Sequence, residues 1–94
     1  MASRVSTGAP QARLGDTSSH GGTIVTGAQR TLVDGKPAAR MGDLHSCPIP
    51  FHGVTRIARG AGRTLIEGKP AARVGDIAGC GAVIVTGSDT ALVE

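Results

Sequence analysis

The stretch DGKPAARMGD at residues 34–43 decides the fold of this chain, because it occurs a second time, nearly unchanged, as EGKPAARVGD at residues 67–76. A fainter third copy, GAPQARLGD, lies at residues 8–16. Three copies of one short unit in a chain of 94 residues indicate a fold built by internal repetition.

The spacing of the copies predicts that the repeats close into a ring. A glycine landmark follows each Gly-Asp pair, 11, 17 and 11 residues after the aspartate, so the middle repeat carries a six-residue insertion within residues 44–59. An acidic residue lies seven positions further on in every repeat, and in the last repeat it is Glu94. The Gly-x-Pro segment that should follow Glu94 stands at residues 8–10 instead. A linear solenoid would need caps at both ends, so we predict that the two ends of the chain complete the third repeat around a pseudo-threefold axis. The glycine landmarks are Gly27, Gly60 and Gly87.

The segments between these landmarks are predicted to be short strands. Residues 23–26, 63–66 and 83–86 are rich in β-branched side chains, and Gly35, Gly68 and Gly8 fit two-residue hairpin turns. No window shows apolar residues at helical spacing, and the 15 glycines disfavour helices. We therefore predict an all-β fold of three short-stranded repeats.

The composition describes one small domain with a modest core. The sequence contains a single aromatic residue, Phe51, and a core made of Val, Ile, Leu and Ala at this length often needs a metal, a disulfide or a partner to be stable. We assign one domain to residues 1–94, with the repeat core at residues 8–94 and an N-terminal extension at residues 1–7.

Charge and hydropathy exclude several classes of function. The net charge is +3, and the densest basic stretch, residues 56–63, has no interleaved aromatic residues, which favours a solvated face over a nucleic-acid surface. No apolar run approaches the roughly 18 residues that span a bilayer, and residues 1–8 lack the apolar segment of a signal peptide. We expect the chain to start in the cytosol, where its two cysteines would be reduced.

Each copy of the repeat places an arginine three residues before its aspartate. Ion pairs within or between repeats would follow from this spacing, whereas solvated pairs would contribute only about 0–1 kcal/mol each. The pairs are Arg13 with Asp16, Arg40 with Asp43, and Arg73 with Asp76.

All three histidines and both cysteines follow the Gly-Asp pairs. The residue four positions past each aspartate is His20, Cys47 or Cys80. Counted backward from the glycine landmarks, His52 aligns with His20 and Cys80, and each of these three precedes a glycine. In a threefold ring these side chains should converge near one end of the axis, with His45 and Cys47 in the same region.

Imidazole and thiolate groups that converge from three loops match the tetrahedral N/S preference of zinc. We predict a structural Zn²⁺ held by His20, His52, Cys80 and a fourth ligand, which is His45 or Cys47. The proline after Cys47 indicates a turn in which Cys47 packs inward, so His45 is the predicted fourth ligand and Cys47 the alternative. A Cys47–Cys80 disulfide is a competing interpretation, but it would leave three clustered histidines without a role.

The chain resembles the PAAR-repeat family. The sequence Pro-Ala-Ala-Arg occurs at residues 37–40 and 70–73, with Pro-Gln-Ala-Arg at residues 10–13, and the resemblance extends over about residues 8–94. It implies a small pointed cone of β-structure with a zinc near the vertex, held by three histidines and one cysteine. In this sequence those ligands would be His20, His45, His52 and Cys80.

The resemblance also implies a function. Such proteins cap and sharpen the trimeric VgrG spike of the type VI secretion system and help in membrane puncture and effector delivery. The expected partners are VgrG and secreted effectors or adaptors, without nucleic acid and without stable membrane insertion before firing. The protein would be cytoplasmic when assembled, and then secreted or delivered into target cells.

The resemblance implies no enzymatic activity, so we predict no catalytic residues. The alternative is a small zinc-dependent hydrolase in which His20, His52 and Cys80 leave an open position for water. Such a site also needs a general base, and only the repeated aspartates lie nearby in the sequence.

Overall fold

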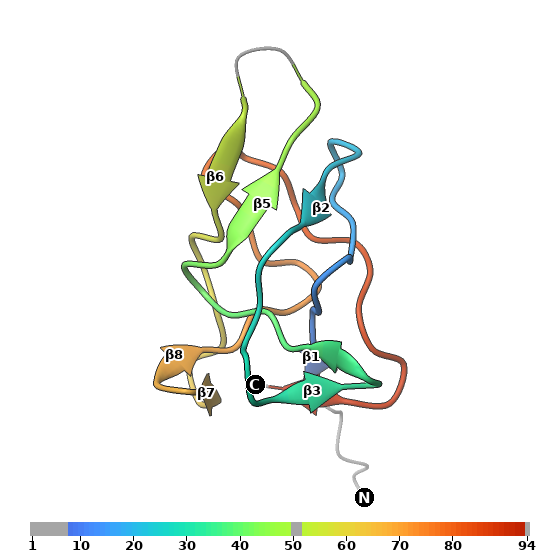
Figure 1. The fold of residues 1–94 in the computed structure, drawn as a ribbon, viewed down its shortest axis with the longest axis vertical. Helices are drawn as coiled ribbons and strands as arrows, with labels where there is room; N and C mark the ends of the chain where they lie inside the picture. Colours follow the sequence, from blue (N-terminus) through green and yellow to red (C-terminus); the bar gives the residue numbers. More distant parts are fainter. Residues whose placement is uncertain (1–7, 50–51, 94) are drawn as a thin grey trace, which may run out of the picture.

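The computed structural model describes residues 8–49 and 52–93, and this part of the chain forms strands and turns without any helix. The all-β prediction is therefore confirmed (Figure 1). Within the same residues there is accordingly no helix of the length and hydropathy that a membrane crossing requires. Glu94, Phe51 and the extension at residues 1–7, which enter the predictions above, lie outside the described residues.

The described residues form nine strands of two or three residues each. In chain order they are β1 (Ala9–Pro10), β2 (Thr23–Ile24), β3 (Leu32–Val33), β4 (Lys36–Pro37), β5 (Leu44–Ser46), β6 (Val54–Arg56), β7 (Leu65–Ile66), β8 (Lys69–Pro70) and β9 (Leu92–Val93).

Three two-stranded hairpins lie at one end of the molecule, which we call the base (Figure 1). Strand β3 pairs with β4, and β7 with β8, each joined by a tight turn. The third pair joins β1 to β9 from the two ends of the chain, with Ala9 opposite Val93 and Pro10 opposite Leu92. The ends of the chain therefore complete the third repeat, as predicted.

The two covalently continuous hairpins turn on the predicted acidic-glycine pairs. Asp34 and Glu67 have φ of 53° and 51°, and Gly35 and Gly68 have φ of 79° and 84°. Positive φ at both central residues is what a type I′ turn needs, and its twist matches that of the flanking strands. Strands β9 and β1 come from opposite ends of the chain, so no covalent turn joins them.

Backbone hydrogen bonds run around the axis from repeat to repeat. The N–H of Ala12 donates to the carbonyl of Ala72, that of Ala72 to Ala39, and that of Ala39 to Ala12, at 2.9–3.0 Å. Two closed cycles of equivalent bonds are the signature of a ring with pseudo-threefold symmetry. The second cycle runs from Leu14 to Pro37, from Met41 to Pro70 and from Val74 to Pro10.

The core consists of small side chains stacked along this axis. The three alanines of the first cycle are fully buried, and three isoleucines pack against them. A side chain as small as a methyl group lets the three chain segments approach one another closely. These isoleucines are Ile24, Ile57 and Ile84. A second cluster nearer the base contains Ala38 and Ala71.

Gln11 occupies the position of Ala38 and Ala71 in the third repeat and is buried. Its amide nitrogen donates to the carbonyl oxygens of Ala12 (2.7 Å) and Ala39 (2.9 Å). The degenerate copy of the motif thus ties two repeats together with a side chain.

Each arginine of the repeat forms an ion pair with the aspartate three residues later, at 3.0–3.1 Å. The aspartates are buried, and each also accepts the backbone N–H of its arginine. Arg13 reaches on to Asp34 (3.0 Å), and Arg40 to Glu67 (3.7 Å), so each of these two arginines also contacts the hairpin turn of another repeat. The predicted ion pairs are therefore present, within and between repeats.

The insertion in the middle repeat forms the β5–β6 hairpin, and β2 pairs with the other side of β5. This sheet lies away from the base (Figure 1). The predicted strand at residues 83–86 is only partly present, because its residues make the isolated bridges Ile77–Val83 and Ser18–Ile84 and no continuous ladder. These segments are so short that each forms a single β-bridge with a neighbouring segment instead of a ladder.

Candidate metal centre

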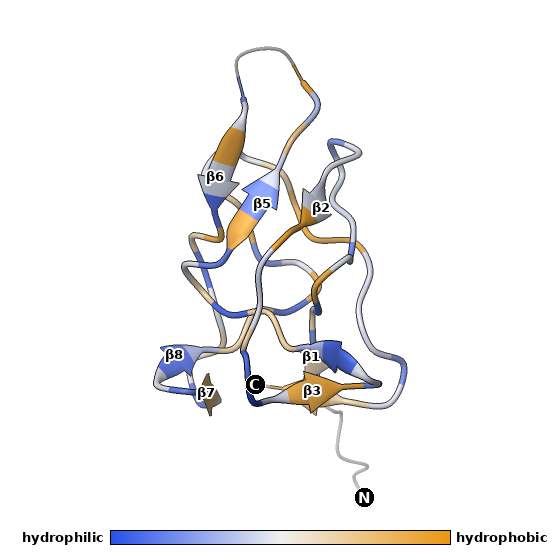
Figure 2. Cartoon of the chain, viewed as in Figure 1, coloured by the Kyte–Doolittle hydropathy of each residue, from blue (hydrophilic) through white to orange (hydrophobic). Residues whose placement is uncertain are grey.

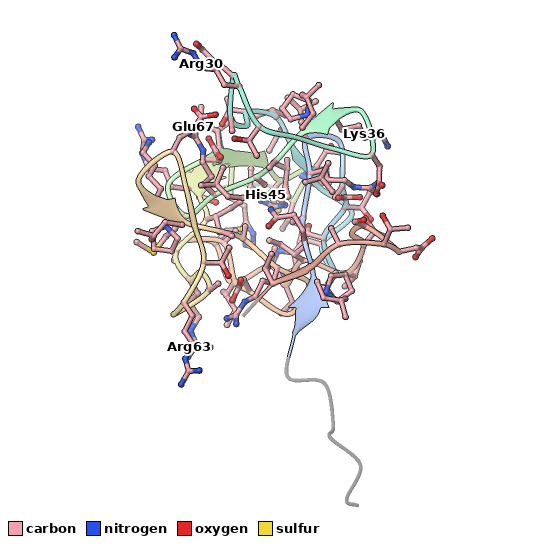
Figure 3. The ribbon with its side chains drawn as sticks, turned by 90° about the horizontal axis from the view of Figure 1, so that it is seen from below. Arg30, Lys36, His45, Arg63 and Glu67 are labelled. Atoms are coloured by element: carbon pink, nitrogen blue, oxygen red, sulfur yellow. The ribbon has the colours of Figure 1, made fainter. Side chains whose placement is uncertain are left out.

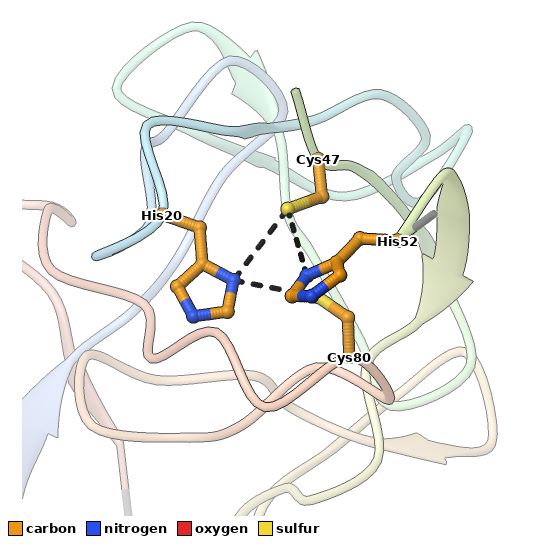
Figure 4. Close-up of side chains that lie close together, drawn as sticks. All are labelled: His20, Cys47, His52 and Cys80. Atoms are coloured by element: carbon orange, nitrogen blue, oxygen red, sulfur yellow. Dashed lines mark hydrogen bonds between the residues drawn. The ribbon is translucent and has the colours of Figure 1, made fainter. Parts of the chain in front are cut away.

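Four side chains with metal-binding atoms converge (Figure 4). They lie beside strands β2, β5 and β6, in the half of the molecule away from the base (Figure 1). They are His20, before β2; Cys47, after β5; His52, before β6; and Cys80, in the third repeat. One ligand atom from each lies within 4.8 Å of all the others. Three loops of the ring thus bring imidazole and thiol groups to one place, as the repeat alignment predicts.

Three of the distances between these atoms are close to those around a tetrahedral ion. The Sγ of Cys47 lies 3.5 Å from Nδ1 of His20 and 3.4 Å from Nδ1 of His52, and the Sγ of Cys80 lies 3.9 Å from Nδ1 of His20. Zinc bonds of about 2.0–2.3 Å place tetrahedral ligand atoms roughly 3.3–3.8 Å apart. The donor set therefore needs little rearrangement to hold Zn²⁺.

The glycines that follow three of these residues shape the loops. Gly21, Gly53 and Gly81 have φ of 79°, 61° and 92°, a left-handed conformation that glycine adopts without steric cost. The N–H of Gly21 donates to the carbonyl of Ser18 in a tight turn, at 2.9 Å. These turns direct His20, His52 and Cys80 toward one another over a very short length of chain.

Both cysteines are free thiols, with Cys47 buried and Cys80 partly buried. Burial alone would raise the pKa of Cys80, but hydrogen bonds, of which the Ala82 backbone N–H gives the strongest, outweigh it and leave that pKa below its ordinary value. Because the thiolate is the form that binds a metal, this environment prepares Cys80 as a ligand.

His45 lies beside the four-residue group and does not belong to it. Its ring is fully buried in β5, with Nε2 2.8 Å from Oγ of Ser18 and Nδ1 4.0 Å from Sγ of Cys80. Burial, and then the nearby His20, lower the pKa of His45, so the ring is held in its neutral form.

The structure thus brings together three residues predicted from the sequence, His20, His52 and Cys80, and places Cys47 with them. Cys47 is the alternative fourth ligand that the sequence left open. The ring of His45 lies beside the group, with Nδ1 4.0 Å from Sγ of Cys80. The sequence feature that identifies Cys47 is its distance from the aspartate of its repeat. Cys47, His20 and Cys80 each lie four residues after that aspartate. His45 shares the second position with Ser18 and Ala78, which are both buried.

The repeated aspartates, which the sequence offers as candidates for a general base, are 4–5% exposed and accept hydrogen bonds from their arginines. Two of them also accept a threonine hydroxyl, from Thr86 to Asp16 and from Thr26 to Asp43, at 2.9 Å. Their carboxylates are thus engaged in holding the repeats together.

The fold and the site define a class: a triplicated β ring with a group of imidazole and thiol side chains at one end that could hold a metal ion. The family model of the PAAR motif matches residues 14–86 of the 94-residue chain. The chain therefore belongs to the PAAR-motif family, the spike-tip proteins of type VI secretion. A search of curated proteins found no match to it.

Proposed function

We propose that this protein caps the trimeric VgrG spike of the type VI secretion system, with its hairpin base on the spike and a structural zinc near its vertex. The observation that carries the proposal is the base itself, which presents three equivalent hairpins around a pseudo-threefold axis. A threefold partner offers three equal docking sites, and a closed ring of three repeats can occupy all of them at once.

The base also carries apolar groups of the kind that a stable interface buries. One leucine stands at the same position of each hairpin, opposite a proline, and Figure 2 shows β3 as an apolar strand on this end. The exposed fractions are 61% for Leu32, 66% for Leu65 and 54% for Leu92. Short strands at the base could continue the open strand edges of a partner by β-addition.

We propose that the zinc is held by His20, Cys47, His52 and Cys80. One ligand atom from each lies within 4.8 Å of the others, and Sγ of Cys47 is 3.4–3.5 Å from the two imidazole nitrogens, whereas His45 stands outside the group. Four protein ligands give a closed, structural site. Such an ion would hold loops that have no core of their own, and it would stabilise the end that meets the target membrane.

Binding to purified VgrG trimer tests the docking proposal. We expect one chain per trimer by light scattering, and at least a tenfold loss of affinity for Leu32→Asp or Leu65→Asp, because each would bury a charge. Val54→Asp is the matched control, since Val54 is 59% exposed but lies on β6, outside the base. Equal losses in control and leucine variants, or none in either, would contradict docking through the base.

Metal analysis tests the second part of the proposal. We expect one zinc per chain, retained in His45→Ala and lost in Cys47→Ser and Cys80→Ser. Loss of zinc in His45→Ala with full retention in Cys47→Ser would restore the three-histidine set.

We further propose that the protein assembles in the cytoplasm and leaves the cell with the spike. A tagged copy should appear in the medium of secreting cells and be absent from the medium of cells whose contractile sheath is deleted. Equal release from both strains would contradict this route.

A further inference from the structure

We propose that His45 is a positioning residue of the metal centre, whose Nδ1–H donates a hydrogen bond to the sulfur of Cys80 while Ser18 holds the ring from the other side. This inference rests on the proposed metal site and adds a residue that acts through one of its ligands.

The position of His45 in the repeat supports this role. His45, Ser18 and Ala78 are the residues two positions after the three aspartates, and all three are buried. The residues four positions after the aspartates are the proposed ligands from these segments. The ring of His45 therefore belongs to the layer of side chains directly below the metal centre.

The fold makes room for this ring in a way that the other repeats do not need. A Cβ on Gly22 would lie 2.7 Å from Nε2 of His45 and would also collide with the carbonyl oxygen of Ser46. The third repeat has Ala82 at the corresponding position. The neighbouring repeat offers it the small Ser18 in place of a histidine, since Ile84 bridges Ser18 as Ile24 pairs with His45. A large ring at residue 45 is thus matched by the missing side chain at residue 22.

The hydrogen bonds of Ser18 favour one tautomer of this ring. The N–H of Gly22 donates to Oγ of Ser18 at 3.2 Å, and Nε2 of His45, at 2.8 Å, is the acceptor that the described residues offer to the hydroxyl proton. We therefore assign the hydroxyl as the donor to Nε2. Nε2 is then an acceptor, so the proton of the neutral ring is on Nδ1. That nitrogen lies 4.0 Å from Sγ of Cys80.

A donated hydrogen bond has a defined effect on a metal thiolate. It stabilises the lone pairs on sulfur and orients the ligand, and loss of such an outer partner typically weakens metal binding about 10–100-fold. His45 would therefore tune Cys80 without any bond of its own to the ion.

Cobalt substitution of the full chain tests this assignment, with Co²⁺ alone as the probe. In His45→Ala the thiolate-to-cobalt charge-transfer band should move to lower energy, while the intense d–d bands of a four-coordinate ion persist. His45→Asn restores a side-chain N–H near Nδ1 and should return the band toward the wild-type energy. Ser18→Ala should shift it in the direction of His45→Ala, whereas Ser19→Ala, an exposed neighbour, should leave it unchanged.

Competition with a chromophoric chelator should show about 10–100-fold weaker binding in His45→Ala. An unshifted band in both His45→Ala and Ser18→Ala would overturn the inference, and so would loss of the tetrahedral d–d bands in His45→Ala, which would make His45 a ligand. If His45→Ala does not fold, His45→Asn and Ser18→Ala decide the question. Absence of cobalt binding by the wild-type chain would instead overturn the metal site itself.

Discussion

At the scale of single residues, the buried arginine–aspartate pairs define how the repeats are held. The carboxylate of Asp43 accepts hydrogen bonds from two side-chain nitrogens and the backbone N–H of Arg40, and a further one from the hydroxyl of Thr26. Burial alone would raise the pKa of Asp43, but these hydrogen bonds outweigh it and leave the pKa below its ordinary value. The same balance lowers the pKa of Asp16, with Thr86 in place of Thr26.

We expect acid to destabilise the fold through these two carboxylates. Because their pKa values are lower in the folded chain than in the unfolded one, their contribution is complete above about pH 4 and is lost as the pH falls through the folded values. Asp43→Asn should cost on the order of 2 kcal/mol at pH 7. Denaturant unfolding should show that the stability of Asp43→Asn falls less steeply than that of wild type between about pH 5 and pH 3, which is roughly the window of carboxylate titration.

Any contribution of a bound metal to the pH profile is common to both chains and cancels in the difference between them. Thr26→Val removes one donor to Asp43, and with it the acceptor of the Leu44 N–H. Because the bonds from Arg40 remain, this variant should give an intermediate pH profile. Parallel curves for Asp43→Asn and wild type would show that this carboxylate does not link stability to pH.

At the scale of elements, the glycine landmarks allow the chain that enters each hairpin to pass directly beside the end of the hairpin's second strand. A Cβ on Gly60 would lie 2.7 Å from Cβ of Pro70 and 3.1 Å from the carbonyl oxygen of Ala71. Gly27 has the same relation to Pro37 and Ala38. The regular spacing from glycine to hairpin is thus a packing requirement.

We predict that Gly60→Ala destabilises the protein by about 1–3 kcal/mol, the usual cost of overpacking against rigid backbone. Gly62→Ala is the matched control two residues away, because its Cβ would meet nothing within 4 Å and its φ is not positive. Thermal unfolding monitored by far-UV circular dichroism measures both. Similar melting temperatures for the two variants would mean that the landmark glycine is not needed for packing.

At the scale of the whole molecule, the protein is a stack of threefold layers. Alanine clusters lie toward the base. Next come Ile24, Ile57 and Ile84, which stand directly opposite His45, Ala78 and Ser18, and then the proposed ligands. Figure 3 shows His45 near the centre of the ring when the molecule is seen from below, with Arg30, Lys36 and Arg63 at the outside. The hydrophobic clusters lie toward the base, so the end that carries the proposed ligands needs another source of stability.

We expect removal of the metal to reveal this difference. A site occupied at 100 times its Kd contributes about 2.7 kcal/mol, which in a domain of this size corresponds to a fall in Tm of roughly 10–20 °C on chelation. Cys80→Ser should start from the lower Tm and show no further change with chelator. A wild-type Tm that is insensitive to chelator would contradict a structural role of the metal.

The sequence by itself determined the number of repeats, the hairpin turns and the closure of the third repeat by β1 and β9, because these follow from counts along the chain that any ring must satisfy. It also identified the region where imidazoles and thiols meet. Only the tertiary structure decided which side chain lies at which height on the axis. Gln11 replaces a core alanine, Cys47 stands at the level of His20 and Cys80, and His45 lies one layer below. The physical reason is that two residues along a short strand move a side chain from one layer to the next, and only the packed neighbours, such as Ser18 and Gly22, define where each layer is.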